Sequence, residues 1–130
     1  MRGPLPVLVV DDQAPFRSAM KAVLRHMQEF EVVGEASNGA EAVELAGQLH
    51  PALVLMDINM PEMNGIDAAR RLVQESPGVT VVLCSTYDAG DLPPDVATSG
   101  AVAYLNKEHL GADVLRRVWS EREGGGFVTA

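Results

Sequence analysis

Four short apolar runs constrain the fold of this chain more than any other feature of its sequence. They lie at residues 5–10, 53–56, 79–84 and 101–105 and contain almost no polar residue. A strand with one face in water alternates apolar and polar side chains, whereas a continuous apolar run is typical of a strand that is covered on both faces. The runs therefore predict a parallel sheet with helices on each side, in the α/β class.

The segments between these runs have the spacing of amphipathic helices, as Phe16 and Met20 show after the first run. Asn38 and Asn64 stand where they can cap the starts of a second and a third helix. Five strand-helix units in one domain are expected, over residues 1–123, with a Gly-rich tail at 124–130. The remaining elements are a strand at 31–36, a short helix around 95–99 and a last helix that ends at the glycines 124–126.

Composition limits the classes of partner. Asp and Glu outnumber Lys and Arg by 18 to 10, giving a net charge of -8. An acidic chain repels phosphate backbones, so direct binding to nucleic acid is not expected. The sequence has one cysteine and no apolar stretch that reaches the ~18 residues needed to span a bilayer. We therefore expect a cytoplasmic protein with no membrane contact.

Polar and charged residues follow four of the predicted strands directly. The carboxyl ends of parallel strands share one edge of a sheet, so these side chains should converge there. Clustered carboxylates repel one another and favour a hard cation such as Mg²⁺. For the first pair of acids alone, a turn with a helix cap explains the sequence equally well. The residues are Asp11 and Asp12, Asp57, Ser85 and Thr86, and Lys107.

Four motifs resemble the landmarks of the receiver domains of response regulators in bacterial two-component systems. They are VLVVDDQ at 7–13, LVLMDINMPEMNG at 53–65, VVLCSTYD at 81–88 and AYLNK at 103–107. The resemblance extends over residues 5–122. It implies a flavodoxin-like, doubly wound fold of three α/β/α layers, with five parallel strands in the order 2-1-3-4-5 and five helices.

The resemblance also implies a phosphoacceptor switch rather than an enzyme with a separate substrate. Asp57 would accept a phosphoryl group from a sensor histidine kinase or a phosphotransfer protein. Asp12, Asp57 and the main-chain carbonyl of Asn59 would bind Mg²⁺, and Asp11 would act through water.

The remaining roles concern the phosphoryl oxygens and the switch. Lys107 would hold one oxygen and Ser85 another, with Thr86 as the alternative to Ser85. Tyr104 would be the aromatic residue that changes its rotamer, although the residues alone favour a half-buried core tyrosine at this position. Glu108 stands after Lys107 where many members of the family have proline, which leaves the geometry of that turn open.

The output surface implied by the family is the face made by the fourth helix, the fifth strand and the last helix. Pro93 and Pro94 predict that the fourth helix is short and mobile. Trp119 lies one position past Val118 on the last helix, so part of its surface is expected outside the core. Such a residue suits self-association or partner docking, and the alternative is that it covers the helix end.

Two other classes also use residues of this kind. A phosphatase of the haloacid-dehalogenase class would need a second aspartate at position 59, where the chain has Asn59. A non-phosphorylated binding module, either a pseudo-receiver or a flavodoxin-like FMN protein, is disfavoured by the complete set of acids with Lys107 and by Asp11-Asp12-Gln13 in place of a phosphate-binding loop. The sequence leaves open whether an output domain follows.

Overall fold

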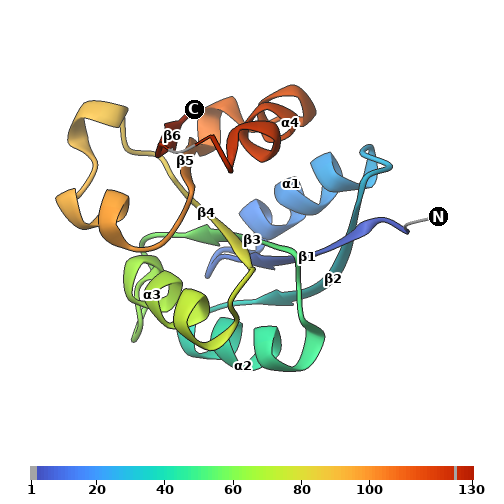
Figure 1. The fold of residues 1–130 in the computed structure, drawn as a ribbon, viewed down its shortest axis with the longest axis horizontal. Coiled ribbons are helices and arrows are strands. Elements are labelled where there is room, and N and C mark those ends of the chain that lie inside the picture. The colour runs from blue at the N-terminus through green and yellow to red at the C-terminus, as the bar shows by residue number, and fades with distance from the viewer. Residues whose placement is uncertain (1–2, 125) are drawn as a thin grey trace.

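A computed structural model describes residues 3–124 and 126–130, and in these residues six parallel strands form one sheet in the order β2-β1-β3-β4-β5-β6 (Figure 1). No helix in the same residues is long and apolar enough to cross a membrane. The strands are β1 (Leu5–Val10), β2 (Phe30–Ala36), β3 (Leu53–Asp57), β4 (Thr80–Ser85), β5 (Ala103–Asn106) and β6 (Val128–Thr129). The helices are α1 (Ala14–Arg25), α2 (Gly39–Leu49), α3 (Gly65–Glu75) and α4 (Ala112–Glu121), with 3₁₀ helices at Ala89–Asp91, Pro94–Thr98 and Lys107–His109.

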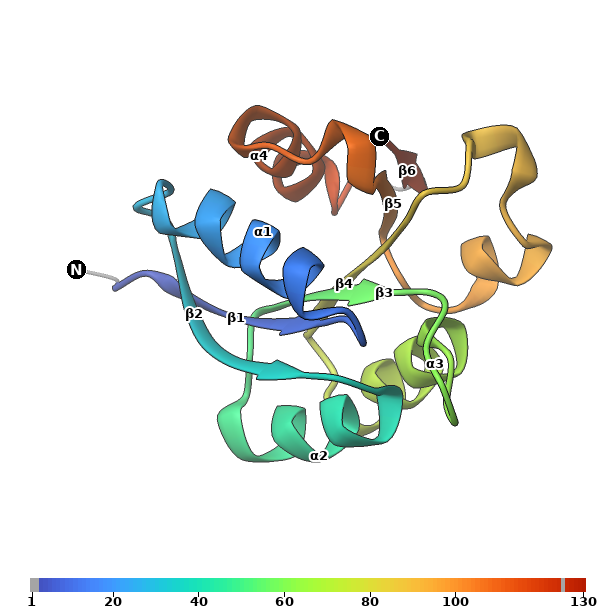
Figure 2. The same cartoon turned by 180° about the vertical axis from the view of Figure 1, so that it is seen from behind.

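The sheet is covered on both faces, which confirms the predicted fold class. Helices α1 and α4 lie on one face and α2 and α3 on the other (Figures 1 and 2). Successive residues of β1 alternate between the two layers: Val7 and Val9 pack with α1 and α4, and Leu8 and Val10 pack with α2 and α3. All four are fully buried, as expected for a continuous apolar strand inside a three-layer domain.

Both predicted asparagine caps are present. The Asn38 side chain accepts a hydrogen bond from the amide of Glu41 at 2.8 Å, and Asn64 accepts one from Asp67 at 2.9 Å. Directly after Asn64, the start of α3 packs so closely on β3 that a Cβ atom at Gly65 would lie 2.1 Å from the main-chain oxygen of Asp57. Glycine is therefore needed at this position, and the contact holds the end of β3 in place.

The prediction of five α-helices was wrong by one. The expected fourth helix is a 3₁₀ helix at Pro94–Thr98. Pro93 and Pro94 donate no amide hydrogen bond, Gly100 ends the segment with φ of +95°, and Val96 is the single buried apolar side chain within the 3₁₀ helix. So short an apolar face gives too little burial to hold a regular helix.

The sheet also has one strand more than predicted. The end of the Gly-rich tail forms β6, which pairs in parallel with β5. The amides of Val128 and Ala130 donate to the carbonyls of Val102 and Tyr104 at 3.0 and 2.8 Å, and the amide of Asn106 donates to Ala130 at 2.8 Å. The edge of β5 offers unpaired amides and carbonyls, and the tail satisfies them. The five-strand order 2-1-3-4-5 is otherwise confirmed.

Candidate phosphoacceptor site

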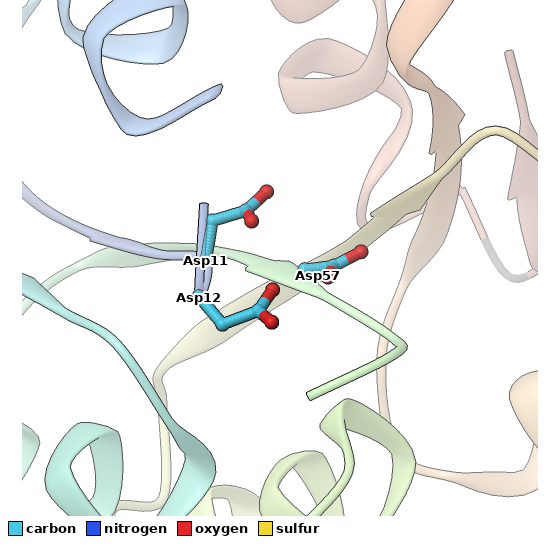
Figure 3. Close-up of side chains that lie close together, drawn as sticks. All are labelled: Asp11, Asp12 and Asp57. Carbon is cyan, nitrogen blue, oxygen red and sulfur yellow. The ribbon is translucent and has the colours of Figure 1, made fainter. Parts of the chain in front are cut away.

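The acidic residues predicted to meet do meet. Asp11 and Asp12 follow β1, and Asp57 is the last residue of β3. One oxygen atom from each of these side chains lies within 4.8 Å of the others. Their carboxylates point toward a common space at the carboxyl edge of the sheet (Figure 3).

Asp11 is fully buried beneath this space. Its Oδ1 atom accepts a hydrogen bond from the amide of Gln13 at 2.9 Å. The guanidinium of Arg17 donates to the main-chain oxygen of Asp11 at 2.6 Å and pairs with Glu35, so the turn after β1 is held from the outside. The other carboxylate oxygen, Oδ2, is buried and faces the ammonium of Lys107.

Lys107 supplies the positive charge of the site. Its Nζ atom lies 2.6 Å from Asp11 Oδ2, as an ion pair without hydrogen-bond alignment, and 3.3 Å from Asp57 Oδ1. The lysine side chain is 6% exposed, so these ion pairs are shielded from water. It also lies over the ring of Phe16, 3.8 Å from the ring centroid. One ammonium faces three carboxylates, which leaves an excess of negative charge.

The carboxyl group of Asp57 has a raised pKa in this environment. Burial raises the pKa of its carboxyl from 3.8 to about 6, Lys107 opposes the rise, and Asp11 and Asp12 add to it. At neutral pH the group is therefore mostly a carboxylate, and its burial in this form costs free energy. A bound cation would lower this cost.

The donor set fits Mg²⁺. Three carboxylates offer oxygen ligands, a single ammonium offsets their charge, and the cluster contains no histidine or cysteine. Small hard cations take one or two carboxylates and keep several waters, which suits a cluster in which Asp12 is exposed.

Polar residues form the rim of the site. Ser85 is buried at the end of β4, and its Oγ atom accepts a long hydrogen bond of 3.5 Å from the side-chain amide of Asn59. The hydroxyl of Tyr87 donates to Asn59 Oδ1 at 3.4 Å. Thr86, the alternative to Ser85, is exposed. The predicted role of the Asn59 main-chain oxygen stays a prediction.

The turn that carries Lys107 is organised by Asn106, which the sequence did not single out as a site residue. The Oδ1 atom of Asn106 accepts a hydrogen bond from the amide of Glu108 at 2.9 Å, so a side-chain cap starts the 3₁₀ helix that bears the lysine. Its amide group donates to the main-chain oxygen of Tyr87 at 3.2 Å. The sequence signal was an asparagine at the end of an apolar strand, which is a common cap residue.

Tyr104 is fully buried rather than half-buried. Its hydroxyl donates to the main-chain oxygen of Tyr87 at 2.7 Å, and burial raises the pKa of the phenol to about 12. The side chain is therefore in an inward position. Whether its rotamer changes is still a prediction.

With this geometry established, comparison with known protein families matches residues 7–118 to the response regulator receiver domain. The chain belongs to this family. It is therefore a signalling domain of the phosphoacceptor kind found in two-component systems, and the family favours this function over the phosphatase and the non-phosphorylated module.

Individual relatives and solved structures agree with the family. The chain is 36% identical over 124 residues to the transcriptional regulatory protein DegU of Brevibacillus brevis, covering 95% of this chain and 52% of that protein. It is 40% identical over 101 residues to the chemotaxis protein CheY of Thermotoga maritima, covering 78% of this chain and 83% of that one. The receiver domain of the NarL regulator of Mycobacterium tuberculosis superposes with a TM-score of 0.84 at 28% identity, covering 95% and 99% of the two chains. The receiver thus spans about half the length of DegU.

Proposed function

We propose that Asp57 accepts a phosphoryl group from a phosphohistidine of a partner kinase or phosphotransfer protein, and that Mg²⁺ bound beside it is required. The observation that carries this proposal is the convergence of three carboxylates and one ammonium at a single sheet edge. Receiver domains as a family are phosphorylated by histidine kinases. The chain itself acts on no separate substrate in this proposal.

The transfer needs little from the protein beyond position and charge. A carboxylate oxygen of Asp57 attacks phosphorus, the bond between phosphorus and the donor imidazole nitrogen breaks, and that nitrogen keeps the electron pair. The product is an acyl phosphate on Asp57. Lys107 holds one phosphoryl oxygen, and Ser85 donates its hydroxyl to another. The proximity of Ser85 to Asn59 supports this assignment over exposed Thr86.

The proposed metal ligands are Asp12, Asp57 and the main-chain oxygen of Asn59, with Asp11 acting through water. Mg²⁺ at this position would neutralise charge that develops on the phosphoryl oxygens. The excess of negative charge supports the proposal, because three converging carboxylates face a single ammonium and a bound cation would offset the remaining charge.

For the output we propose the surface made by the 3₁₀ helix at Pro94–Thr98, β5 and α4, on which β6 covers the edge of the buried strand β5, and which would self-associate or dock a partner. Trp119 is a weaker anchor than expected. Its ring packs edge-to-face on Phe30 with 5.4 Å between centroids, and the Arg122 guanidinium lies 3.8 Å from its centroid. These contacts favour the alternative, in which the ring covers the end of α4, where it also packs on Phe30 of β2. With Trp119 weakened as an anchor, the main support for this output surface is the hydrogen bond that the hydroxyl of Tyr104, on β5, donates to the loop after β4.

Two sequence-based assignments remain proposals. We propose that residues 1–123 form the receiver domain and that 124–130 form a separate Gly-rich tail, although Val128 and Thr129 pair with β5. We also propose that the protein acts in the cytoplasm, without membrane contact and without binding nucleic acid through this domain, in keeping with its acidic charge.

The test is intact-mass measurement after incubation with acetyl phosphate and Mg²⁺. We expect one added phosphoryl group on the wild type and none on Asp57→Asn. Omitting Mg²⁺ should prevent labelling of the wild type. Equal labelling of the two proteins would exclude Asp57 as the acceptor. Sedimentation with and without beryllofluoride then tests the output surface, since an activated chain that neither self-associates nor binds a partner would exclude it.

A further inference from the structure

The ammonium of Lys107 lies over an aromatic ring that comes from a different part of the fold. Its Nζ atom is 3.8 Å from the centroid of Phe16, a residue in the first turn of α1. The sequence identified Phe16 as part of the apolar face of that helix. In the structure it joins α1 to the turn after β5, where Lys107 begins a 3₁₀ helix.

Lys107 has competing partners. Asp11 Oδ2 is 2.6 Å from Nζ, and Asp57 Oδ1 is 3.3 Å from it, so the closer carboxylate is the one that does not accept the phosphoryl group. A lysine side chain has four flexible carbon-carbon bonds, and its three donors rotate freely. The two carboxylates therefore compete for the ammonium, and the shorter of the two ion pairs favours Asp11.

The face of Phe16 supplies a third attraction. An aromatic ring attracts a cation through its quadrupole, and the effect is larger where the cation is shielded from water. Lys107 meets that condition, with 6% of its side chain exposed. The ring accepts no proton and forms no ion pair, so it steadies the ammonium without competing for its charge.

The ring is itself held in a fixed place relative to the acids. The amides of Phe16 and Arg17 donate to the main-chain oxygen of Gln13 at 3.1 and 3.2 Å, which closes the first turn of α1. Arg17 also donates to the main-chain oxygen of Asp11 at 2.6 Å. The same turn therefore holds both the ring and the backbone of the acid cluster.

We propose that Phe16 is a positioning residue for Lys107. Its ring keeps the ammonium between Asp11 and Asp57, so that the lysine can hold an oxygen of a phosphoryl group on Asp57 instead of withdrawing to Asp11. This inference rests on the proposed role of Lys107 in phosphoryl transfer. A leucine of similar bulk would fill the space but would not attract the ammonium.

The test is a double-mutant cycle on the rate of phosphorylation by acetyl phosphate at saturating Mg²⁺. We expect Phe16→Leu to slow the reaction about three- to tenfold in the wild-type background, and to have no effect in a Lys107→Ala background. Phe16→Tyr keeps an aromatic face, so this variant should retain most of the wild-type rate. Met20→Ala, a buried change one turn further along α1, is the control for lost packing, and should slow both backgrounds equally if it slows either.

Side-chain NMR gives a second readout that packing alone would not change. The chain has two lysines, Lys21 and Lys107. The ring current of Phe16 should shift the ε-methylene protons of Lys107 upfield, and Phe16→Leu should abolish that shift. Lys21, which pairs with Glu35 at the surface, serves as the internal reference.

The outcomes separate the two proposals. If Lys107→Ala leaves the rate unchanged, the proposed role of Lys107 fails and the role of Phe16 fails with it. If Lys107→Ala slows the reaction but Phe16→Leu matches the wild type, or slows both backgrounds equally, the role of Phe16 alone is excluded. An unshifted Lys107 methylene resonance in the wild type would also exclude it.

Discussion

The hydroxyl of Tyr104, on β5, donates a 2.7 Å hydrogen bond to the main-chain oxygen of Tyr87, in the loop after β4. The side-chain amide of Asn106 donates to the same oxygen at 3.2 Å. Tyr87 in turn reaches the rim of the acid cluster through Asn59. The interior of β5 and the phosphoacceptor site are therefore connected by a short chain of hydrogen bonds. A movement of the loop after β4 would have to change the hydrogen bond of the buried Tyr104.

Replacing Tyr104 with phenylalanine tests the first bond of that chain. The phenyl ring keeps the packing, but the carbonyl of Tyr87 loses its shorter donor. We expect the free energy of unfolding to fall by about 0.5–1.5 kcal/mol, because Asn106 still bonds the same oxygen. Urea unfolding measures the change. A loss of more than about 3 kcal/mol would mean that the ring itself had moved.

The rim residue Tyr87 should affect the lifetime of the acyl phosphate. Asn59 and Tyr87 flank the expected path of the attacking water, and neither is a strong base, so we expect slow hydrolysis. Tyr87→Ala opens that path and should speed the decay by about two- to tenfold, a range that corresponds to 0.4–1.4 kcal/mol of barrier. Tyr87→Phe is the matched variant that removes the hydroxyl alone. If the acyl phosphate decays at the same rate in the wild type and both variants, Tyr87 does not control its lifetime.

The raised pKa of Asp57 predicts a pH-dependent stability. Its folded-state pKa of about 6 lies above the ordinary value of 3.8, so the folded state binds the proton more tightly than the unfolded chain does. The stability linked to this proton is present below pH 3.8 and is lost as pH rises through about 6. In EDTA, Asp57→Asn should therefore be more stable than the wild type at pH 7.5, by about 1–3 kcal/mol. At pH 4.5 most of this difference in stability should disappear. Urea unfolding of both proteins at the two pH values measures it, and a difference that stays constant would contradict the prediction.

Replacing two helical glycines with alanine should change the stability of the protein in opposite directions. A Cβ at Gly65 would collide with the main-chain oxygen of Asp57, whereas a Cβ at Gly47, inside α2, would meet no atom within 4 Å. We expect Gly47→Ala to stabilise the protein by about 0.5–1 kcal/mol through helix propensity. Gly65→Ala should destabilise it by about 2 kcal/mol or more and slow phosphorylation of Asp57. Thermal unfolding and the mass assay measure both effects, and equal behaviour of the two variants would contradict the close packing of α3 on β3.

The pairing of β6 with β5 can be tested by placing proline at neighbouring positions. Val128→Pro removes an amide that donates to Val102, and we expect a loss of about 1 kcal/mol or more in stability and greater self-association of the uncovered edge. Alternate amides of a strand point to opposite sides, so the amide of Thr129 faces away from β5 and Thr129→Pro is the control. Unfolding and sedimentation compare the two variants. Similar results for both would argue against the strand.

The strands and the acid cluster could be predicted from the sequence because their signals are local. Continuous apolar runs indicate buried parallel strands, and the carboxyl ends of such strands share an edge, so Asp11, Asp57 and Lys107 could be brought together without knowing any contact. The bounds of β1 matched the expected ones, and those of β2 to β5 differed by one or two residues. The asparagine caps were predictable for the same reason, since a cap bonds an amide three residues away.

Only the tertiary structure decided the features that depend on partners distant in the chain. Phe16 carries the periodicity of an ordinary core residue, and its position under Lys107 follows from how α1 packs beside the turn after β5. The tail has no strand periodicity of its own, and Val128 and Thr129 form a strand because β5 offers an unpaired edge. Trp119 could equally have faced solvent, and it packs on Phe30 because α4 lies next to the start of β2. A local pattern determines which element forms, whereas the free energy of a contact between distant segments depends on the geometry that the whole fold imposes.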